Sequence, residues 1–142
     1  MKKKKLAVDG KTILFVCYGN TCRSPMAEGL AKKTLGGRAQ VESAGLAPVF
    51  DGATYETVKT MRDLYDVDIS HHVPRNVTET PLRSFDWIIV LDRYVFKTMK
   101  GLASDLEDKL LFWDIPDPFG KDMAFYKRVA DKIWNCIQDF LL

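Results

Sequence analysis

Short, mainly apolar runs and longer helical segments alternate along this chain. The apolar runs at 12–16, 85–91 and 109–113, with a shorter one at 41–43, are typical of strands in a buried parallel sheet. Helices are predicted at 26–33, 54–65, 93–102 and from about residue 122 to the end. Because strands and helices alternate, we expect a single α/β domain with a mainly parallel sheet.

The spacing of apolar residues predicts which side of a helix is buried. Positions three and four apart carry the predicted core side chains of 54–65 and of the last helix, namely Val58, Met61, Leu64, Tyr65, Phe125, Val129, Ile133, Ile137 and Phe140. Gly36 suits the end of the first helix, and Asp92 suits the N-cap of 93–102. Pro74 argues against regular structure in 67–77.

Size and charge narrow the class of protein. A chain of 142 residues can build one domain with a true core, which we place at 12–142 after a flexible, basic N-terminus at 1–11. The net charge of +2 is too small to indicate a nucleic-acid partner, and no apolar run is long enough to suggest a membrane partner. Three cysteines disfavour a secreted disulfide framework and favour a reducing, cytoplasmic compartment.

The candidate chemistry lies in one stretch, Val16-Cys17-Tyr18-Gly19-Asn20-Thr21-Cys22-Arg23-Ser24-Pro25, between the first strand and the first helix. Pro25 suits the first helical position, with Ser24 as its N-cap. Loop N–H groups and a helix N-terminus then converge on one point, where Arg23 can bind a tetrahedral oxyanion with two N–H groups. The same positive field should hold Cys17 as a thiolate, placed to attack a bound phosphate.

The spacing Cys-x5-Arg-Ser after a strand is the signature of cysteine-dependent phosphatases. Its flanks, from Phe15 to Glu28, closely resemble the low-molecular-weight protein-tyrosine-phosphatase family, and the resemblance extends from Ile13 to the last helix. It implies a four-stranded parallel sheet of order 2-1-3-4 with helices on both faces. It also implies hydrolysis of phosphorylated protein side chains through a cysteinyl-phosphate intermediate, with inorganic phosphate as product and no metal or other cofactor.

Asp117 is the expected general acid. Prolines on both sides restrict its backbone and aim its carboxyl group. The resembled family places its general acid in an Asp-Pro-aromatic loop near the C-terminus, which Asp117-Pro118-Phe119 matches. We therefore expect Cys17 to attack phosphorus, Arg23 to hold the phosphate oxygens, and Asp117 to protonate the leaving atom and later activate water.

Other residues are expected to bind the substrate or to support the loop. The predicted substrate-binding residues are Tyr18, Gly19, Asn20, Thr21, Cys22, Ser24 and Phe119. Ser24 is also expected to hydrogen-bond the sulfur, and Asn20 to adopt an unusual backbone angle and tie the loop with its side chain. His72 aligns with a histidine that the family uses to brace this loop, with His71 as a rival.

Cys22 has two open roles. It can form a reversible disulfide with Cys17 that protects the nucleophile, or it can simply fill the loop. A zinc site that combines these cysteines with His71 and His72 is disfavoured, because Arg23 would place a cation beside the metal.

Two features bear on the substrate. Thr21 stands where the tyrosine-directed branch usually carries isoleucine, and bacterial relatives that resemble protein arginine phosphatases combine threonine there with an Asp-Pro-Phe-Gly loop, as this chain does at 117–120. Phe50, Tyr55 and Phe119 can form an aromatic wall against a phenyl ring or a guanidinium group. Phosphotyrosine is the main prediction and phosphoarginine the alternative.

Two further interpretations are disfavoured. Arsenate reductase, an oxidoreductase with a similar anion loop, needs resolving cysteines shortly after the third strand, and 91–99 contains none. An inactive phosphate-binding module would be expected to lack Cys17, Arg23 or Asp117, and all three are present.

Overall fold

The structure is a computed structural model that describes residues 4–142. Its sheet consists of β1 (Thr12–Cys17), β2 (Gln40–Gly45), β3 (Trp87–Val90) and β4 (Leu110–Phe112), all parallel and in the order β2-β1-β3-β4. The α-helices are α1 (Arg23–Leu35), α2 (Tyr55–Tyr65), α3 (Arg93–Leu102) and α4 (Met123–Leu141). Short 3₁₀ turns occupy Gly36–Arg38, Val77–Glu79, Leu82–Ser84 and Ser104–Lys109. The predicted fold and strand order are confirmed.

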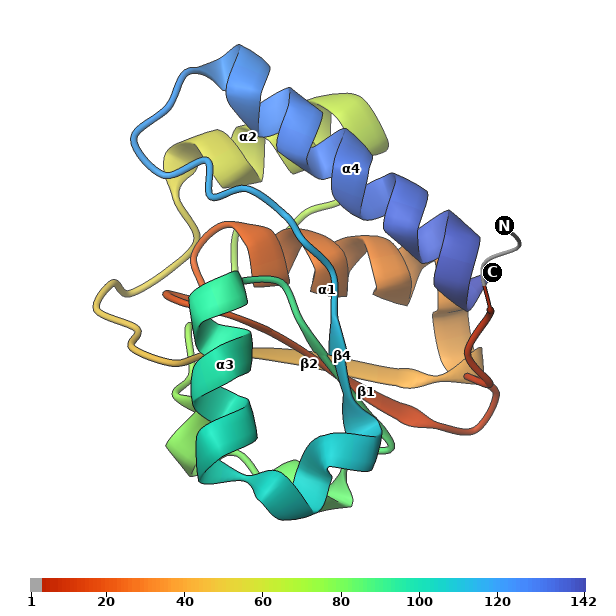
Figure 1. Cartoon of the computed structure of the whole chain (residues 1–142). Helices are drawn as coiled ribbons and strands as arrows, with labels where there is room; N and C mark the ends of the chain where they lie inside the picture. Colours follow the sequence, from red (N-terminus) through yellow and green to blue (C-terminus); the bar gives the residue numbers. More distant parts are fainter. Residues whose placement is uncertain (1–3) are drawn as a thin grey trace.

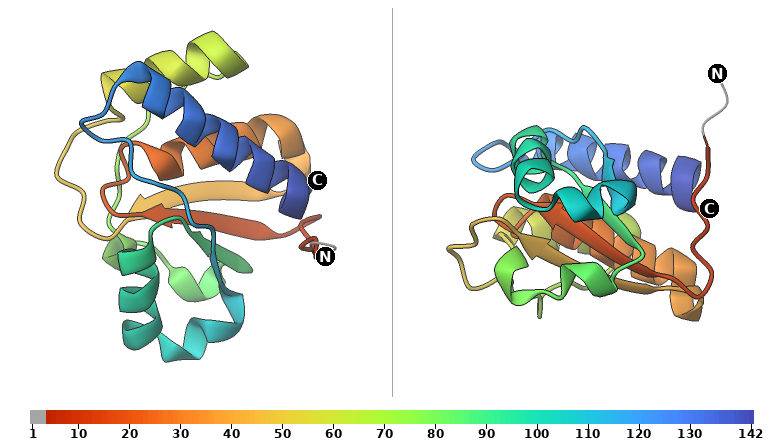
Figure 2. Two further views of the ribbon diagram at one scale, coloured as in Figure 1. Left: turned by 45° about the horizontal axis from the view of Figure 1, so that its top comes forward. Right: turned by 60° about the horizontal axis from the view of Figure 1, so that its bottom comes forward.

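The helices form two layers around the sheet. Figure 1 and the two views of Figure 2 show α1, α2 and α4 on one face and α3 on the other. Side chains of β1 alternate between these layers: Ile13 and Phe15 pack with α1 and α4, whereas Leu14 and Val16 pack with α3. Because β1 is paired on both sides, by β2 and β3, its last residue, Cys17, is held at the carboxyl edge of the sheet.

Helix α1 begins earlier than the sequence indicates. Its first residue is Arg23 and its N-cap is Cys22, which makes no side-chain capping bond. The prediction that Ser24 caps this helix and that Pro25 opens it is therefore wrong. Both residues lie in the first turn, where proline is still tolerated because the N–H groups there have no helical acceptor. The side chain of Ser24 is consequently free to turn toward Cys17.

The other helices begin at side-chain caps. Thr54 caps α2, Asp92 caps α3 as predicted, and Asp122 caps α4, each accepting a hydrogen bond from the N–H three residues on. Helix α1 ends at Gly36, which has φ 56°, as expected for a glycine C-cap.

The buried faces of α2 and α4 match the predicted ones in part. Helix α2 packs on α4 and buries the predicted Met61 together with Thr57 and Thr60. The predicted Val58 and Tyr65 are only partly buried, and Leu64 is 44% exposed. In α4 the predicted Val129, Ile133 and Ile137 are buried, together with Tyr126, Ala130 and Leu141. The predicted Phe125 and Phe140 are only partly buried, and Phe140 stacks on Trp113 at the edge of the core.

The N-terminal segment runs beside the end of α4. Lys2 and Lys3 lie outside the described residues. Lys5 Nζ donates to Leu142 O at 2.7 Å, and Leu6 N donates to Phe140 O at 2.8 Å. No helix within residues 4–142 combines the length and the apolar character that crossing a membrane requires.

Candidate active site

The loop from Cys17 to Arg23 turns its carbonyl groups away from its own centre. Five of them accept hydrogen bonds from outside: Cys17 O from Leu46 N (3.1 Å), Tyr18 O from Ala47 N (2.9 Å), Asn20 O from His72 Nε2 (2.8 Å), Thr21 O from Thr54 N (3.0 Å) and Cys22 O from Met26 N (3.2 Å). In a trans peptide, the N–H of the next residue points the opposite way, and the chain has no cis peptide within 4–142. Five N–H groups therefore point into the loop, those of Tyr18, Gly19, Thr21, Cys22 and Arg23. They form a cup of donors suited to an anion.

The sulfur of Cys17 lies at the floor of this cup. The backbone N–H of Asn20 points to Cys17 Sγ at 3.2 Å, and Ser24 Oγ lies 2.9 Å from the same sulfur. Ser24 Oγ accepts a hydrogen bond from Asn20 Nδ2 at 2.7 Å, so its own proton is available to the sulfur. Two donors are thus aimed at the sulfur of a residue that is only 2% exposed.

Asn20 holds the loop in shape. Its φ of 56° lies in the left-handed region, which asparagine tolerates better than most residues. Its side-chain amide donates to Ser24 and to Ser43 Oγ (3.0 Å), and its Oδ1 accepts from Arg75 N at 2.9 Å. Ser43 in turn donates to Glu28. A continuous series of hydrogen bonds therefore connects a carboxylate on α1 to the sulfur.

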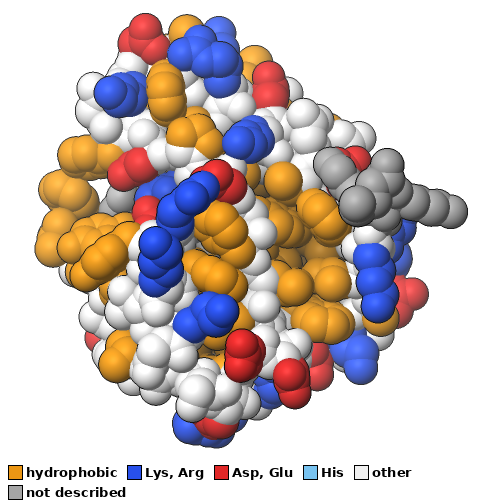
Figure 3. All heavy atoms as spheres, in the orientation of Figure 1, with side chains coloured by type: hydrophobic (Ala, Val, Ile, Leu, Met, Phe, Trp, Pro, Cys, Tyr) orange, Lys and Arg blue, Asp and Glu red, His pale blue; other side chains and the backbone are white. Residues whose placement is uncertain are grey.

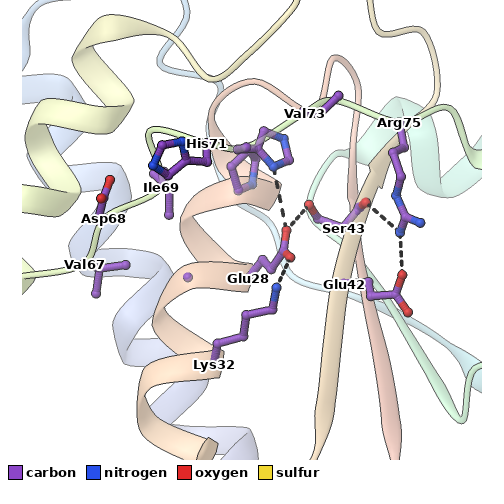
Figure 4. A pocket seen from close by; sticks show the side chains of 13 residues that line it. Glu28, Lys32, Glu42, Ser43, Val67, Asp68, Ile69, His71, Val73 and Arg75 are labelled. Carbon is purple, nitrogen blue, oxygen red and sulfur yellow. Dashed lines mark hydrogen bonds and ion pairs between the residues drawn. The ribbon is translucent and has the colours of Figure 1, made fainter.

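A groove of about 610 Å³ lies beside this series and is lined by two of its members, Glu28 and Ser43. Figure 4 shows Glu28 in its centre, bonded to Ser43 and ion-paired with Lys32. His72 Nδ1 faces the same carboxylate at 3.9 Å, while its Nε2 braces the loop through Asn20. His71 lines the groove but is exposed, so the structure brings His72, not His71, to the loop.

Gly45 allows the loop to fold back against β2. A Cβ placed on Gly45 would lie 2.9 Å from both Asn20 N and Tyr18 O, closer than such contacts occur. Only glycine fits here without displacing the loop. The local sequence around Gly45 does not indicate this function, because the contact joins residues far apart in the chain.

Arg23 is buried, 4% exposed, and three protein groups hold its guanidinium. Its Nη1 donates to the carbonyl oxygens of Leu91 (3.2 Å) and Ile115 (3.0 Å), and its Nη2 donates to Asp92 Oδ2 at 2.9 Å. Asp117 Oδ2 lies 3.7 Å from the same Nη2. Three of the five guanidinium N–H groups are thereby used among the described residues, which leaves two for an oxyanion. Sequence reasoning identified Asp92 only as a helix cap and missed its contact with Arg23.

A cavity of about 270 Å³ opens above the loop. The predicted site residues that line it are Cys17, Tyr18, Gly19, Thr21, Cys22, Arg23, Asp117 and Phe119. Asn20 and Ser24, also predicted to bind substrate, are fully buried and act on the loop from behind. Phe50 and Phe119 stack at its rim, with ring centroids 5.8 Å apart. Tyr55 is 71% exposed and lies outside the lining, so the aromatic wall consists of Phe50 and Phe119.

Cys22 is surrounded by hydroxyl groups. Thr54 Oγ1 and Tyr126 OH each lie 3.6 Å from its sulfur. Burial raises the pKa of Tyr126, so this phenol keeps its proton and can donate it in a hydrogen bond. Cys17 and Cys22 are both free thiols in the structure. Within residues 4–142, no group of three or more histidine, cysteine or acidic side chains is placed to hold a metal ion.

Comparison with known proteins places this fold and site in one family. The model of the family described as low molecular weight phosphotyrosine protein phosphatase matches residues 12–141. The arsenate reductase 2 of Staphylococcus epidermidis is 34% identical over 133 residues, which cover 94% of this chain and 98% of that protein.

Solved structures give the same result. The tyrosine phosphatase amsI of Erwinia amylovora superposes with a TM-score of 0.83 at 27% identity, covering 92% of this chain and 91% of that one. The YwlE arginine phosphatase with a phosphorylated active-site serine superposes with a TM-score of 0.82, also at 27% identity, covering 90% and 91%.

The fold and the site thus define a cysteine-dependent phosphatase. The chain belongs to the low molecular weight phosphotyrosine protein phosphatase family, as its loop motif indicated. Phosphorylated proteins are accordingly its class of substrate.

We expect Asn20→Ala to lower the free energy of unfolding by about 2 to 4 kcal/mol, since alanine resists the left-handed conformation and leaves buried polar partners unsatisfied. Asn20→Gly is the matched control, because glycine accepts the same backbone angle but also lacks the side chain. It should lose about 1 kcal/mol less than the alanine variant. Urea unfolding of the two variants measures the difference, and equal losses would show that the backbone angle contributes nothing.

Proposed function

We propose that the protein removes phosphate from phosphotyrosine side chains by transferring the phosphoryl group to Cys17. The cysteine thiolate attacks phosphorus while the bond from phosphorus to the tyrosine oxygen breaks, and Asp117 gives its proton to that oxygen. Asp117 then takes a proton from water as the water attacks the cysteinyl phosphate. Inorganic phosphate leaves, and the thiolate is restored with its two hydrogen-bond donors.

The observation that carries this proposal is the position of the Cys17 sulfur beneath inward-facing N–H groups and beside a fixed arginine. The N–H groups and Arg23 supply the positive field that a transferring phosphoryl group requires along its equatorial oxygens. Asp117 lines the same cavity as the sulfur, and its contact with Phe119 N at 3.1 Å fixes the loop that presents it. The donors are in place before substrate arrives, so little reorganisation is needed during the reaction.

Arsenate reduction is supported only by the names of relatives. The region from Leu91 through α3, which follows β3, has no cysteine, and the one later cysteine is Cys136 on α4. A reductase of this type would need a second sulfur to resolve the product formed on the nucleophile. We therefore assign hydrolysis rather than reduction. We also place the protein in the cytoplasm, where a cysteine nucleophile stays reduced.

Phosphoarginine is the second candidate substrate, and Thr21 is the residue that favours it. Its side chain lines the cavity and is 5% exposed, and its Oγ1 lies over Gly19, 3.4 Å from where a Cβ would be. Threonine occupies less of the cavity than isoleucine, which leaves room for a planar guanidinium beside the loop. The YwlE arginine phosphatase among the structural neighbours supports this second candidate.

We expect Cys17→Ser to abolish turnover of a small aryl phosphate, because a serine hydroxyl is not ionised at neutral pH. Asp117→Asn should lower kcat by about 10²- to 10⁴-fold, the usual contribution of a general acid. Asp122→Asn is the matched control, since it is the same change five residues on and asparagine caps a helix as well as aspartate does. An Asp117→Asn enzyme as active as the Asp122→Asn control would disprove the assignment of the acid.

Thr21→Ile tests the choice between the two substrates. With phosphotyrosine and phosphoarginine peptides of the same sequence, the substitution should lower kcat/KM for phosphoarginine by at least about tenfold relative to phosphotyrosine, since an extra buried methylene group rejects a substrate by about 10- to 200-fold. Phosphate release measures both rates. An unchanged ratio would mean that Thr21 does not select the substrate.

A further inference from the structure

We propose that the exposed side of α3, beside the cavity, is a docking surface for an acidic segment of the phosphoprotein substrate. We define this α3 surface by Arg93, Tyr94, Lys97 and Lys100. The inference rests on the proposed function, because it concerns the polypeptide that flanks the phosphorylated residue.

The α3 surface is continuous with the active-site cavity. Tyr18 lines the cavity, yet its side chain is 47% exposed and reaches outward. Its ring centroid lies 6.3 Å from that of Tyr94, which is 64% exposed in the first turn of α3. The two rings form an exposed aromatic ledge that leads from the mouth of the cavity onto the helix. The ledge therefore offers the polypeptide on one side of the phosphorylated residue a path from the cavity to α3.

All charged side chains of α3 are positive. The helix carries Arg93, Lys97 and Lys100 and no acidic residue. These positions are four and three residues apart, so they follow one side of the helix. Figure 3 shows lysine and arginine side chains gathered over the part of the surface where α3 lies in Figure 1.

Not all of this charge is neutralised by neighbouring side chains. Arg93 pairs with Asp114 at 2.8 Å, and Lys100 approaches Glu107 at 4.0 Å. Lys97 is exposed and has no ion pair within residues 4–142. Lys97 is therefore the cation that is available to a carboxylate of the substrate.

The lengths of the helix and of an extended peptide indicate how far from the phosphorylated residue that carboxylate should lie. A helix rises about 1.5 Å per residue, so Lys97 and Lys100 lie about 5 and 9 Å along the axis from Tyr94. An extended peptide advances about 3.3 Å per residue. Acidic side chains about two to four positions from the phosphorylated residue, on one side of it, should thus reach the two lysines.

The test uses phosphotyrosine peptides that differ only at positions two to four on one side of the phosphorylated residue, with aspartate, asparagine or lysine there. A second set carries the same changes on the other side. In one of the two sets kcat/KM should fall in the order aspartate, asparagine, lysine, by about three- to tenfold per step, and the differences should shrink as salt is raised.

Lys97→Glu should reverse that order, and Lys97→Gln should reduce the difference between aspartate and lysine. Lys132→Glu, the same change at an exposed position of α4, should keep the order of the unmodified protein. Turnover of a small aryl phosphate by each variant shows that its cavity is intact and serves to normalise the peptide rates.

Two results would overturn the docking surface: equal kcat/KM for the three peptides in both sets, or the same order in Lys97→Glu as in the unmodified protein. Failure to hydrolyse the small aryl phosphate at all would instead disprove the proposed function. The two failures are therefore distinguishable.

Discussion

The outward anchoring of the loop carbonyls is the constraint on which the site depends. Five loop carbonyls accept hydrogen bonds from the segment after β2, from α1, from Thr54 and from His72. Each of these bonds turns the N–H of the next residue toward the centre of the loop. The anion cup is therefore made by contacts behind it rather than by the loop itself. This explains why residues that do not line the cavity, such as Gly45 and His72, determine the shape of the loop.

The charges at the site are also held by contacts with other elements. Arg23 is a buried cation, and such a charge is tolerated only where it is paired and hydrogen-bonded. Asp92 supplies the pairing, and Asp92 is itself fixed as the N-cap of α3 through Val95 N. On the other side, the bonds from Glu28 through Ser43, Asn20 and Ser24 place a donor on the sulfur of Cys17. Cys17 and Arg23 are thus both held in position by neighbours from other elements.

The sequence predicted those features of the fold and site that depend on residues close together in the chain. Cys17 and Arg23 are six positions apart in one turn, and the alternation of strands and helices predicts the parallel sheet. The contacts that it could not predict join distant segments, as with Gly45 against Asn20 and Asp92 against Arg23. The predicted start of α1 and part of the predicted buried face of α2 are wrong for the same reason, because contacts with distant segments outweigh the local capping and apolar signals.

The most direct test of the account is to find the phosphoryl group on the protein during turnover. The protein is mixed with a phosphotyrosine peptide, quenched rapidly in acid, digested under acidic conditions and examined by fragmentation mass spectrometry. We predict one phosphoryl group on the sulfur of Cys17, formed at least as fast as the substrate turns over and lost when substrate is exhausted. A phosphoryl group on Cys22 or on another side chain, or turnover with no phosphorylated protein at any time, would contradict it.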